Sequence, residues 1–219
     1  HEHLIYDGGS NDGTVELLKE LEVRVVGMRW RSEPDSGIYN ALNKGVRDAQ
    51  GEWLLVLGCD DYIGYVRVLD GLLSHVSPET QVCVSPVQKE YASGIRDIGF
   101  VRKNLFFGMP YCHQGVLIRT DVARALGGFD ERYHISADYD MILKCHIKAL
   151  NIRFYKERYA VFSDFGVSGQ SHGKFGESID IMREQFGLTR LQAEHFKETL
   201  ALPLRVVLPY FFHRDVTLR

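Results

Sequence analysis

A run of four apolar residues, Leu54–Leu57, leads after two positions into a pair of adjacent carboxylates, Asp60 and Asp61. An uninterrupted apolar run of this length suits a strand that is covered on both faces, as in a parallel sheet. Parallel sheets bind ligands at the carboxyl ends of their strands, so both carboxylates should reach a cleft. They repel each other there unless a cation joins them, and a hard divalent cation carrying phosphate oxygens is the natural candidate. A solvated turn is an equal alternative, because Asp is common after strands.

The overall composition is ordinary for a soluble globular protein, with 45% hydrophobic and 25% charged residues. A length of 219 residues suits one domain, or one domain with an appendage. The formal net charge of −3 gives no electrostatic case for a nucleic-acid partner. No apolar run is long enough to span a bilayer. The cysteines form no C-x-x-C pair, so we expect reduced thiols in a cytosolic protein: Cys59, Cys83, Cys112 and Cys145.

Strand-like and helix-like patterns alternate along the first part of the chain. The clearest helix carries apolar residues at i, i+3, i+4, i+7, i+8 and i+11, counted from Ile38. The β-α-β-α-β-α-β order predicts an α/β sandwich. Strands are expected at 4–7, 23–26, 54–57 and 82–84, with helices at about 15–21, 38–49 and 65–76 between them.

The later part of the chain continues this pattern less regularly. Residues 95–101 alternate enough to indicate a hairpin edge, and 116–118 form another buried strand. The remaining expected elements are a short helix at 120–126, a helix that opens near 136, a strand at about 153–155 and a helical tail from 177.

The strand at 4–7 ends in a carboxylate, Asp7, and a glycine-rich turn at 8–14 follows it. The turn lacks both the G-x-G-x-x-G pattern and the Lys-Ser/Thr pair of a P-loop. A plain junction between a strand and a helix is therefore favoured over a phosphate cradle on glycine content alone.

Two polar residues, His113 and Gln114, stand at the entrance of the strand at 116–118. A satisfied core histidine is a serious alternative to a functional role for His113. Asp138 and Asp140 fall in the first turn of a predicted helix, where the helix dipole favours a carboxylate. Simple capping is therefore weighed ahead of a general base that points into the cleft.

Two segments near the C-terminus leave alternatives open. Residues 165–173 are rich in glycine and serine and are typical of a mobile loop or lid. His172 in this loop could approach a metal, but a bare loop histidine is the simpler interpretation. Residues 202–214 are apolar with interspersed basic residues and too short to span a membrane. Contact with a membrane surface and packing on the protein's own core are held equal for them.

Three segments stand out as a set: Tyr6–Thr14, Asp35–Asp61 and Gly127–Asp140. In order and spacing they resemble the inverting family-2 glycosyltransferases with the GT-A fold, and the resemblance covers roughly residues 4–172. It implies a Rossmann-like α/β/α sandwich with a mostly parallel central sheet. It also implies a nucleotide-diphospho-sugar donor, expected to be a UDP-sugar, and an acceptor hydroxyl on a glycan or a lipid-linked acceptor.

The resemblance implies roles for individual residues. Asp7 would contact the nucleotide base, and Asp60 would lie near the ribose. Asp61 would hold the Mg²⁺ or Mn²⁺ ion that bridges the diphosphate, and Asp138 would deprotonate the acceptor hydroxyl. Two more donor-binding residues, and four residues that support the site or contact the acceptor, complete the expected set: Asp35 and Lys44, then His113, Gln114, Asp140 and His172.

Elementary chemistry agrees with this set of residues. A nucleotide diphosphate leaves poorly until a metal neutralises its charge. The acceptor hydroxyl attacks the anomeric carbon in line and needs one carboxylate to take its proton. Direct displacement from one side inverts the anomeric configuration. A metal-binding carboxylate pair and one separate base are therefore the minimal set, and the chain offers both.

The chain departs from the family pattern in two places. Position 58 is Gly where many relatives carry the first Asp of an extended acidic motif, so metal ligation rests on Asp61. Relatives also carry one more strand before the one at Leu4, in the middle of the sheet, and the sequence as given lacks it. An unpaired edge there disfavours a stable monomer and is compatible with a homo-oligomer.

The resulting expectation is a cytoplasmic glycosyltransferase of polysaccharide or glycolipid biosynthesis. A catalytic GT-A domain is expected at 1–175 and a helical C-terminal extension at 176–219, for which contact with the inner face of the membrane is one of the two alternatives given above. The first alternative is a nucleotide-sugar-binding or assembly module that has lost catalysis. A nucleotidyltransferase on a related fold is disfavoured, because no glycine-rich loop with Arg or Lys lies near the start.

Overall fold

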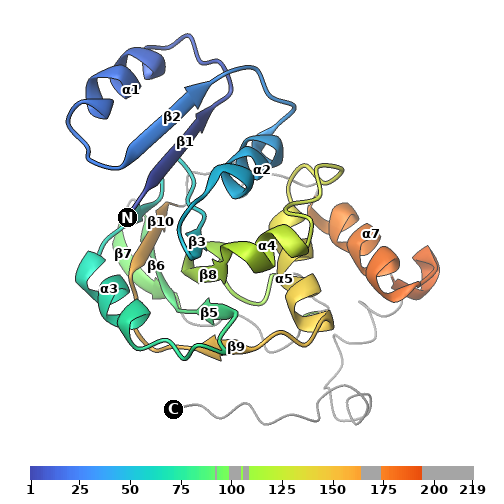
Figure 1. Ribbon diagram of the computed structural model, residues 1–219. Helices are drawn as coiled ribbons and strands as arrows, with labels where there is room; N and C mark the ends of the chain where they lie inside the picture. Colours follow the sequence, from blue (N-terminus) through green and yellow to red (C-terminus); the bar gives the residue numbers. More distant parts are fainter. Residues whose placement is uncertain (92, 99–104, 106–108, 164–173, 194–219) are drawn as a thin grey trace.

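The computed structural model describes residues 1–91, 93–98, 105, 109–163 and 174–193, and Figure 1 shows the elements that they form. The helices are α1 (Thr14–Glu22), α2 (Ile38–Asp48), α3 (Val66–Ser74), α4 (Thr120–Ala125), α5 (Ala137–Ile147) and α7 (Lys174–Phe186). The strands are β1 (His3–Asp7), β2 (Met28–Ser32), β3 (Trp53–Leu55), β4 (Tyr62–Ile63), β5 (Val82–Val84), β6 (Val87–Tyr91), β7 (Gly94–Ile98), β8 (Val116–Arg119), β9 (Ile152–Phe154) and β10 (Ala160–Ser163). One 3₁₀ turn, η2 (His113–Gly115), directly precedes β8.

The described strands form three sheets. β1 and β2 pair in parallel as a two-stranded sheet. β3, β8, β5 and β9 are neighbours in that order, and only β8 runs against the other three. The third sheet has the order β4-β10-β6-β7, with the β6–β7 hairpin at its edge. In Figure 1 the β1–β2 sheet lies with α1 to one side of the other two sheets, and α2 lies between them.

Helices cover both faces of the sheet that contains β5, which makes an α/β/α sandwich. On one face Val82 and Val84 pack with Met141 and Ile142 of α5 in the larger core. On the other face Cys83 packs in a second core with α3 residues. All three residues of β5 are at most 1% exposed, as expected for a continuous apolar run in a strand with two covered faces. The α/β prediction from the sequence is confirmed.

The prediction of a strand at 23–26 is wrong, because the second strand lies at Met28–Ser32. Val23 and Val26 are 85% and 100% exposed and belong to the turn that follows α1. Gly27 at φ +82° ends that turn, and its backbone meets the start of β1. The more informative signal was the alternation in β2, whose even-numbered residues face inward and whose two arginines face solvent.

The strand before the Asp pair is shorter and less buried than the apolar run 54–57 predicts. β3 covers Trp53–Leu55, and all three of its residues are half-buried. Among the described residues β3 pairs only with β8, and β1 pairs only with β2, so each presents one unpaired edge. The run is apolar because it packs on the core through Leu54 and Val56, while one edge of the strand stays open.

The C-terminal helix α7 packs against α5. Ile181 and Met182 of α7 are fully buried, and Ile181 belongs to the larger core. Within the described residues no helix combines the length and apolarity that crossing a membrane requires. The segment 202–214 and the loop 165–173 with His172 lie outside the described residues. The division of the chain at 175 therefore stays a prediction.

Candidate active site

The 3₁₀ turn η2 lies at the centre of the candidate site. Its last residue, Gly115, is pressed against the backbone between β5 and β6: a Cβ there would lie 2.1 Å from the carbonyl oxygen of Ser85. The Ser85 N–H also donates to the carbonyl of Gly115 at 2.8 Å. Glycine is therefore required at this position. The close approach fixes the turn, and with it the side chains of His113 and Gln114.

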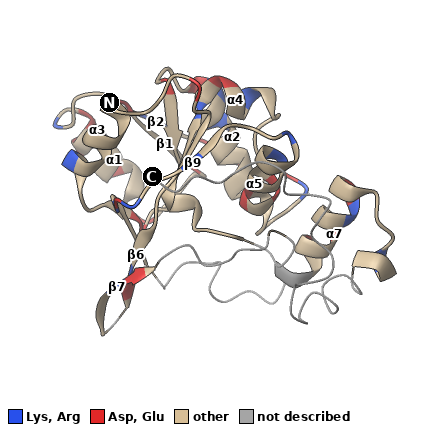
Figure 2. Cartoon of the chain, turned by 90° about the horizontal axis from the view of Figure 1, so that it is seen from below, with Lys and Arg blue, Asp and Glu red and all other residues tan. Residues whose placement is uncertain are grey.

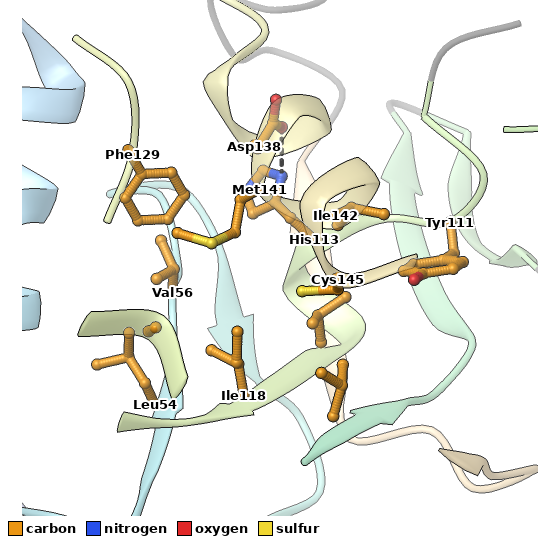
Figure 3. Close-up of a pocket in the computed structure, with 13 residues that line it drawn as sticks. Leu54, Val56, Tyr111, His113, Ile118, Phe129, Asp138, Met141, Ile142 and Cys145 are labelled. Atoms are coloured by element: carbon orange, nitrogen blue, oxygen red, sulfur yellow. Dashed lines mark ion pairs between the residues drawn. The ribbon is translucent and has the colours of Figure 1, made fainter. Parts of the chain in front are cut away.

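His113 pairs with the expected general base. Its Nδ1 lies 3.1 Å from Oδ2 of Asp138, and the two side chains are 33% and 21% exposed. Figure 3 shows the pair facing each other, with His113 reaching from the turn toward α5. Burial on its own lowers the pKa of His113. The hydrogen bond to Asp138 and the charges of Asp138 and Asp61 raise this pKa by more than burial lowers it, so the net shift is upward. The contact therefore stabilises the protonated, positively charged form of His113.

Gln114 holds the expected metal ligand. Its Nε2 donates to Oδ2 of Asp61 at 3.0 Å, and the N–H of Gly58 donates to the same oxygen at 2.8 Å. Neither bond uses Oδ1 of Asp61, so that oxygen remains for a ligand. His113 and Gln114, two successive residues of one turn, thus contact Asp138 on α5 and Asp61 in the loop after β3.

Asp138 makes a local helix contact as well as the contact with His113. Its Oδ1 accepts the N–H of Tyr139 at 2.8 Å, which is the capping-type role that the sequence allowed. The hydroxyl of Tyr39 on α2 lies 3.5 Å from the same oxygen. Burial, followed by the charge of Asp138, raises the pKa of Tyr39, so this phenol stays protonated and is available as a donor. The capping and functional interpretations of Asp138 are therefore compatible.

Asp140 has a different environment from Asp138, because two positions along a helix place side chains on different sides. It is 1% exposed, pairs with Lys144 at 2.6 Å and accepts a hydrogen bond from Gln185 of α7 at 2.8 Å. A carboxylate buried in this way supports the packing of α5 on α7. It offers no surface to an acceptor.

An apolar cavity of about 40 Å³ lies beneath the His113–Asp138 pair (Figure 3). Its walls come from β3, β8, β5, α4 and α5, and include Leu54, Val56 and Met141. Apart from His113 and Asp138 the lining side chains are apolar or aromatic. The pair thus has a low-dielectric floor, which strengthens the attraction between its members.

Asp7 at the end of β1 is held in its ionised form. Its carboxylate accepts four hydrogen bonds, from the hydroxyls of Ser10 (2.5 Å) and Ser32 (2.6 Å) and from the N–H groups of Ser10 (2.9 Å) and Gly9 (3.1 Å). These bonds, led by the one from the Ser10 hydroxyl, lower the pKa of Asp7 to about 2. Three of the four fall on Oδ2, so Oδ1 keeps acceptor capacity for a ligand N–H.

Asp35 and Lys44 lie near Asp7. A Cβ on Gly8 would lie 3.0 Å from Oδ2 of Asp35, so the loops after β1 and β2 touch. Oδ1 of Asp35 accepts the N–H of Gly37 at 2.9 Å, just before α2. Lys44 of α2 is 13% exposed and pairs with Glu33 at 2.8 Å. These residues form a second group, and α2 connects it to the first because α2 also carries Tyr39.

Asp60 is exposed beside Asp61. A Cβ on Gly58 would lie 3.1 Å from Oδ1 of Asp60 and 3.0 Å from Oδ2 of Asp61. A side chain at position 58 would therefore crowd both carboxylates, which gives a local reason for Gly58. Carboxylate oxygens are the ligands that Mg²⁺ and Mn²⁺ prefer, so the residues fit such an ion. Within the described ranges no group of three or more His, Cys, Asp or Glu side chains could enclose a metal.

A clamp between α2 and the loop before α5 was not predicted from the sequence. The side chain of Asn43 accepts the N–H of Phe129 and donates to its carbonyl, both at 2.8 Å. It also donates to Glu131 at 2.8 Å. Gly128, at φ +71°, must be glycine, since a Cβ there would lie 2.4 Å from Oδ1 of Asn43. The only sequence signal was the position of Asn43 beside the apolar stripe of its helix.

An α/β/α sandwich that carries an Asp pair after one strand, and a separate carboxylate at the start of a later helix, belongs to the GT-A class of folds. Solved structures agree. The chain is similar to S. aureus TarS 1–349 in complex with UDP-GlcNAc, with a TM-score of 0.67 and 14% identity over 91% of this chain and 62% of that one. It is also similar to the mannosyltransferase PcManGT from Pyrobaculum calidifontis in complex with GDP-Man and Mn²⁺, with a TM-score of 0.61 and 14% identity over 91% and 61% of the two chains.

The sequence pattern of glycosyl transferase family 2 matches residues 1–120, which is more than half of the chain. The chain belongs to this family. A curated relative, the PGL/p-HBAD biosynthesis glycosyltransferase of Mycobacterium bovis (strain BCG / Pasteur 1173P2), is 29% identical over 174 residues, which is 75% of this chain. The aligned region spans 66% of that relative's length.

Proposed function

We propose that this chain transfers a sugar from a nucleotide-diphospho-sugar to an acceptor hydroxyl with inversion, and that it uses a divalent metal. The observation that carries the proposal is the turn η2, whose neighbouring residues hold Asp61 and Asp138. A donor-side carboxylate and a separate base are thereby kept at one site. The reaction needs this combination and no further covalent catalyst.

On the donor side, Asp61 and Asp60 would hold Mg²⁺ or Mn²⁺, which neutralises the charge of the leaving diphosphate when bound. Gln114 orients Asp61 so that its Oδ1 stays available. Asp7 would accept an N–H of the nucleotide base, for which its low pKa and its remaining acceptor capacity suit it. Asp35 and Lys44 would line the same nucleotide site.

On the acceptor side, Asp138 would take the proton of the attacking hydroxyl. The oxygen then forms the new bond to the anomeric carbon while the bond to the diphosphate oxygen breaks with its electron pair, and the proton ends on the Asp138 carboxylate. Attack opposite the leaving group inverts the anomeric centre. His113, 3.1 Å away, would orient the carboxylate for this proton transfer.

The nature of the substrates rests on the relatives. One similar structure is a complex with UDP-GlcNAc and another a complex with GDP-Man and Mn²⁺, so a nucleotide-sugar donor is supported, and we propose a UDP-sugar. The name of the mycobacterial relative concerns PGL/p-HBAD biosynthesis, which supports a glycan or lipid-linked acceptor. The four free cysteines fit a cytoplasmic location, and lipid-linked acceptors would place the protein at the inner face of the membrane.

A second candidate is a nucleotide-sugar-binding module without catalysis. The observation in its favour is the sparse metal site, where one oxygen of Asp61 is already occupied by two hydrogen bonds. Calorimetry with UDP and Mn²⁺, run beside an assay for release of UDP from UDP-sugars, separates the two. Binding that Asp61→Asn weakens, together with UDP release, supports the transferase. Binding without release supports the module, and no binding of UDP or GDP with Mn²⁺ contradicts both.

A further inference from the structure

Glu177 in the first turn of α7 makes three hydrogen bonds to the segment that leads into α5. Its Oε1 accepts the N–H of His134 at 2.8 Å. Its Oε2 accepts the N–H groups of Ile135 at 2.9 Å and Ser136 at 2.8 Å. A single carboxylate thus satisfies three successive backbone donors, and Asp138 follows two residues after the last of them.

The charge of Glu177 is suited to this position. Ser136 directly precedes α5, and backbone N–H groups at the start of a helix carry positive partial charge without a partner in the helix. Glu177 also lies in the first turn of its own helix, where a carboxylate is favoured for the same reason. Hydrogen bonds from N–H groups to an ionised acceptor are about twice as strong as neutral ones.

The rest of α7 is attached to the same part of the molecule. Gln185 donates to the buried Asp140 at 2.8 Å, and Glu184 pairs with Arg132 at 2.6 Å. The buried side chain of Ile181 packs into the core shared with α5. In Figure 2 α7 lies next to α5, on the opposite side from the β1–β2 sheet. The helix is therefore anchored along its length, and Glu177 anchors the end that meets the start of α5.

We propose that Glu177 is a positioning residue for the general base: it fixes the backbone at 134–136 and thereby where the Asp138 carboxylate stands relative to His113 and the acceptor. This inference rests on the proposed role of Asp138. The remaining contacts of Asp138 come from the side chains of His113 and Tyr39 and from the next N–H in its own helix. These contacts orient the carboxylate, but they do not fix the backbone of residues 134–136, which leads into α5.

The test compares Glu177→Ala with Asp180→Ala. The control removes a carboxylate from the same helix that is exposed and pairs with Arg183. A displacement of about 1 Å at a catalytic group costs on the order of 100-fold in rate. Glu177→Ala should therefore lower kcat about 10- to 100-fold with little change in the KM for the donor, and Glu177→Gln should fall between it and the parent. Acetate should restore part of the rate of Glu177→Ala, because a free carboxylate can occupy the three N–H groups. Asp180→Ala should match the parent.

A second readout does not need turnover. The pKa of His113, followed by NMR and assigned with His113→Gln, reports the distance to the Asp138 carboxylate. It should fall in Glu177→Ala and return toward the parent value with acetate, while Asp180→Ala leaves it unchanged. An unchanged His113 pKa with an unchanged kcat overturns the inference. A KM that rises as much as kcat falls, or an equal effect in Asp180→Ala, assigns Glu177 a merely structural role. If the parent itself releases no UDP while the pKa of His113 moves as expected, the proposed function fails, and only the structural part of the inference stands, that Glu177 positions the Asp138 carboxylate relative to His113.

Discussion

The imidazole Nδ1 of His113 lies 3.1 Å from Oδ2 of Asp138, and this contact connects the two halves of the site. The next residue along the chain, Gln114, holds Asp61. Because both side chains come from one tightly packed turn, the positions of the Asp61 and Asp138 carboxylates are coupled through it. We infer that the turn sets the geometry between leaving group and acceptor.

The His113–Asp138 contact predicts a pH-dependent contribution to stability. The pKa of His113 is raised in the folded protein above its ordinary value of about 6.5. The stabilisation of the folded state by this contact is therefore fully present below about pH 6.5, and it is lost as the pH rises through the folded-state pKa of His113. The free energy of unfolding of the parent should exceed that of His113→Gln by about 1 kcal/mol at pH 6 and by less at pH 9. The value at pH 6 already takes into account that both side chains are partly exposed to solvent. Urea unfolding at the two pH values measures this, and a difference that grows with pH contradicts the assignment.

The clamp of Asn43 on the loop before α5 predicts that two neighbouring glycines differ in their tolerance of a side chain. Gly127 and Gly128 both have positive φ, 88° and 71°. A Cβ at Gly127 meets nothing within 4 Å, whereas one at Gly128 meets Oδ1 of Asn43. Gly127→Ala should cost about 1 kcal/mol of unfolding free energy from the backbone alone, and Gly128→Ala about 3 kcal/mol. Equal losses in denaturant unfolding would show that the clamp does not determine the conformation of this loop.

The cavity beneath the site predicts that one buried valine can be enlarged. Val82 lines the cavity, while Val84 on the same strand is buried away from it. Val82→Ile fills empty space and should raise the free energy of unfolding by about 0.5–1 kcal/mol, or the Tm by about 1–4 °C. Val84→Ile overpacks and should lower both. A fall of the Tm in Val82→Ile would mean that the cavity closes in solution.

Residue patterns predicted the local elements better than the contacts between them. The stripe from Ile38 gives α2, and the buried run 82–84 gives β5, because each period matches one local structure. The exposed Val23 and Val26 were mistaken for a strand, since a short apolar run does not show what covers it. Periodicity also could not show that β3 lies at an open edge.

The partners of the site residues could not be predicted from the sequence, because tertiary structure decides them. Asp138 was a candidate base from the resemblance, but its contact with His113 joins residues from different elements. Asn43 was noticed only as a polar residue beside a helical stripe. Glu177 gave no signal, because its three hydrogen-bond partners are backbone groups, which every sequence has.

The account depends most on Asp138 as the base at a site where Asp61 binds the donor. The direct test is the release of nucleotide diphosphate from UDP-GlcNAc, UDP-glucose and GDP-mannose with Mn²⁺, compared between the parent, Asp138→Asn and the exposed control Asp121→Asn. We expect kcat of Asp138→Asn to fall about 100-fold or more, with calorimetric binding of UDP and Mn²⁺ unchanged and with Asp121→Asn equal to the parent. An Asp138→Asn protein that turns over its donor as fast as the parent would contradict the account.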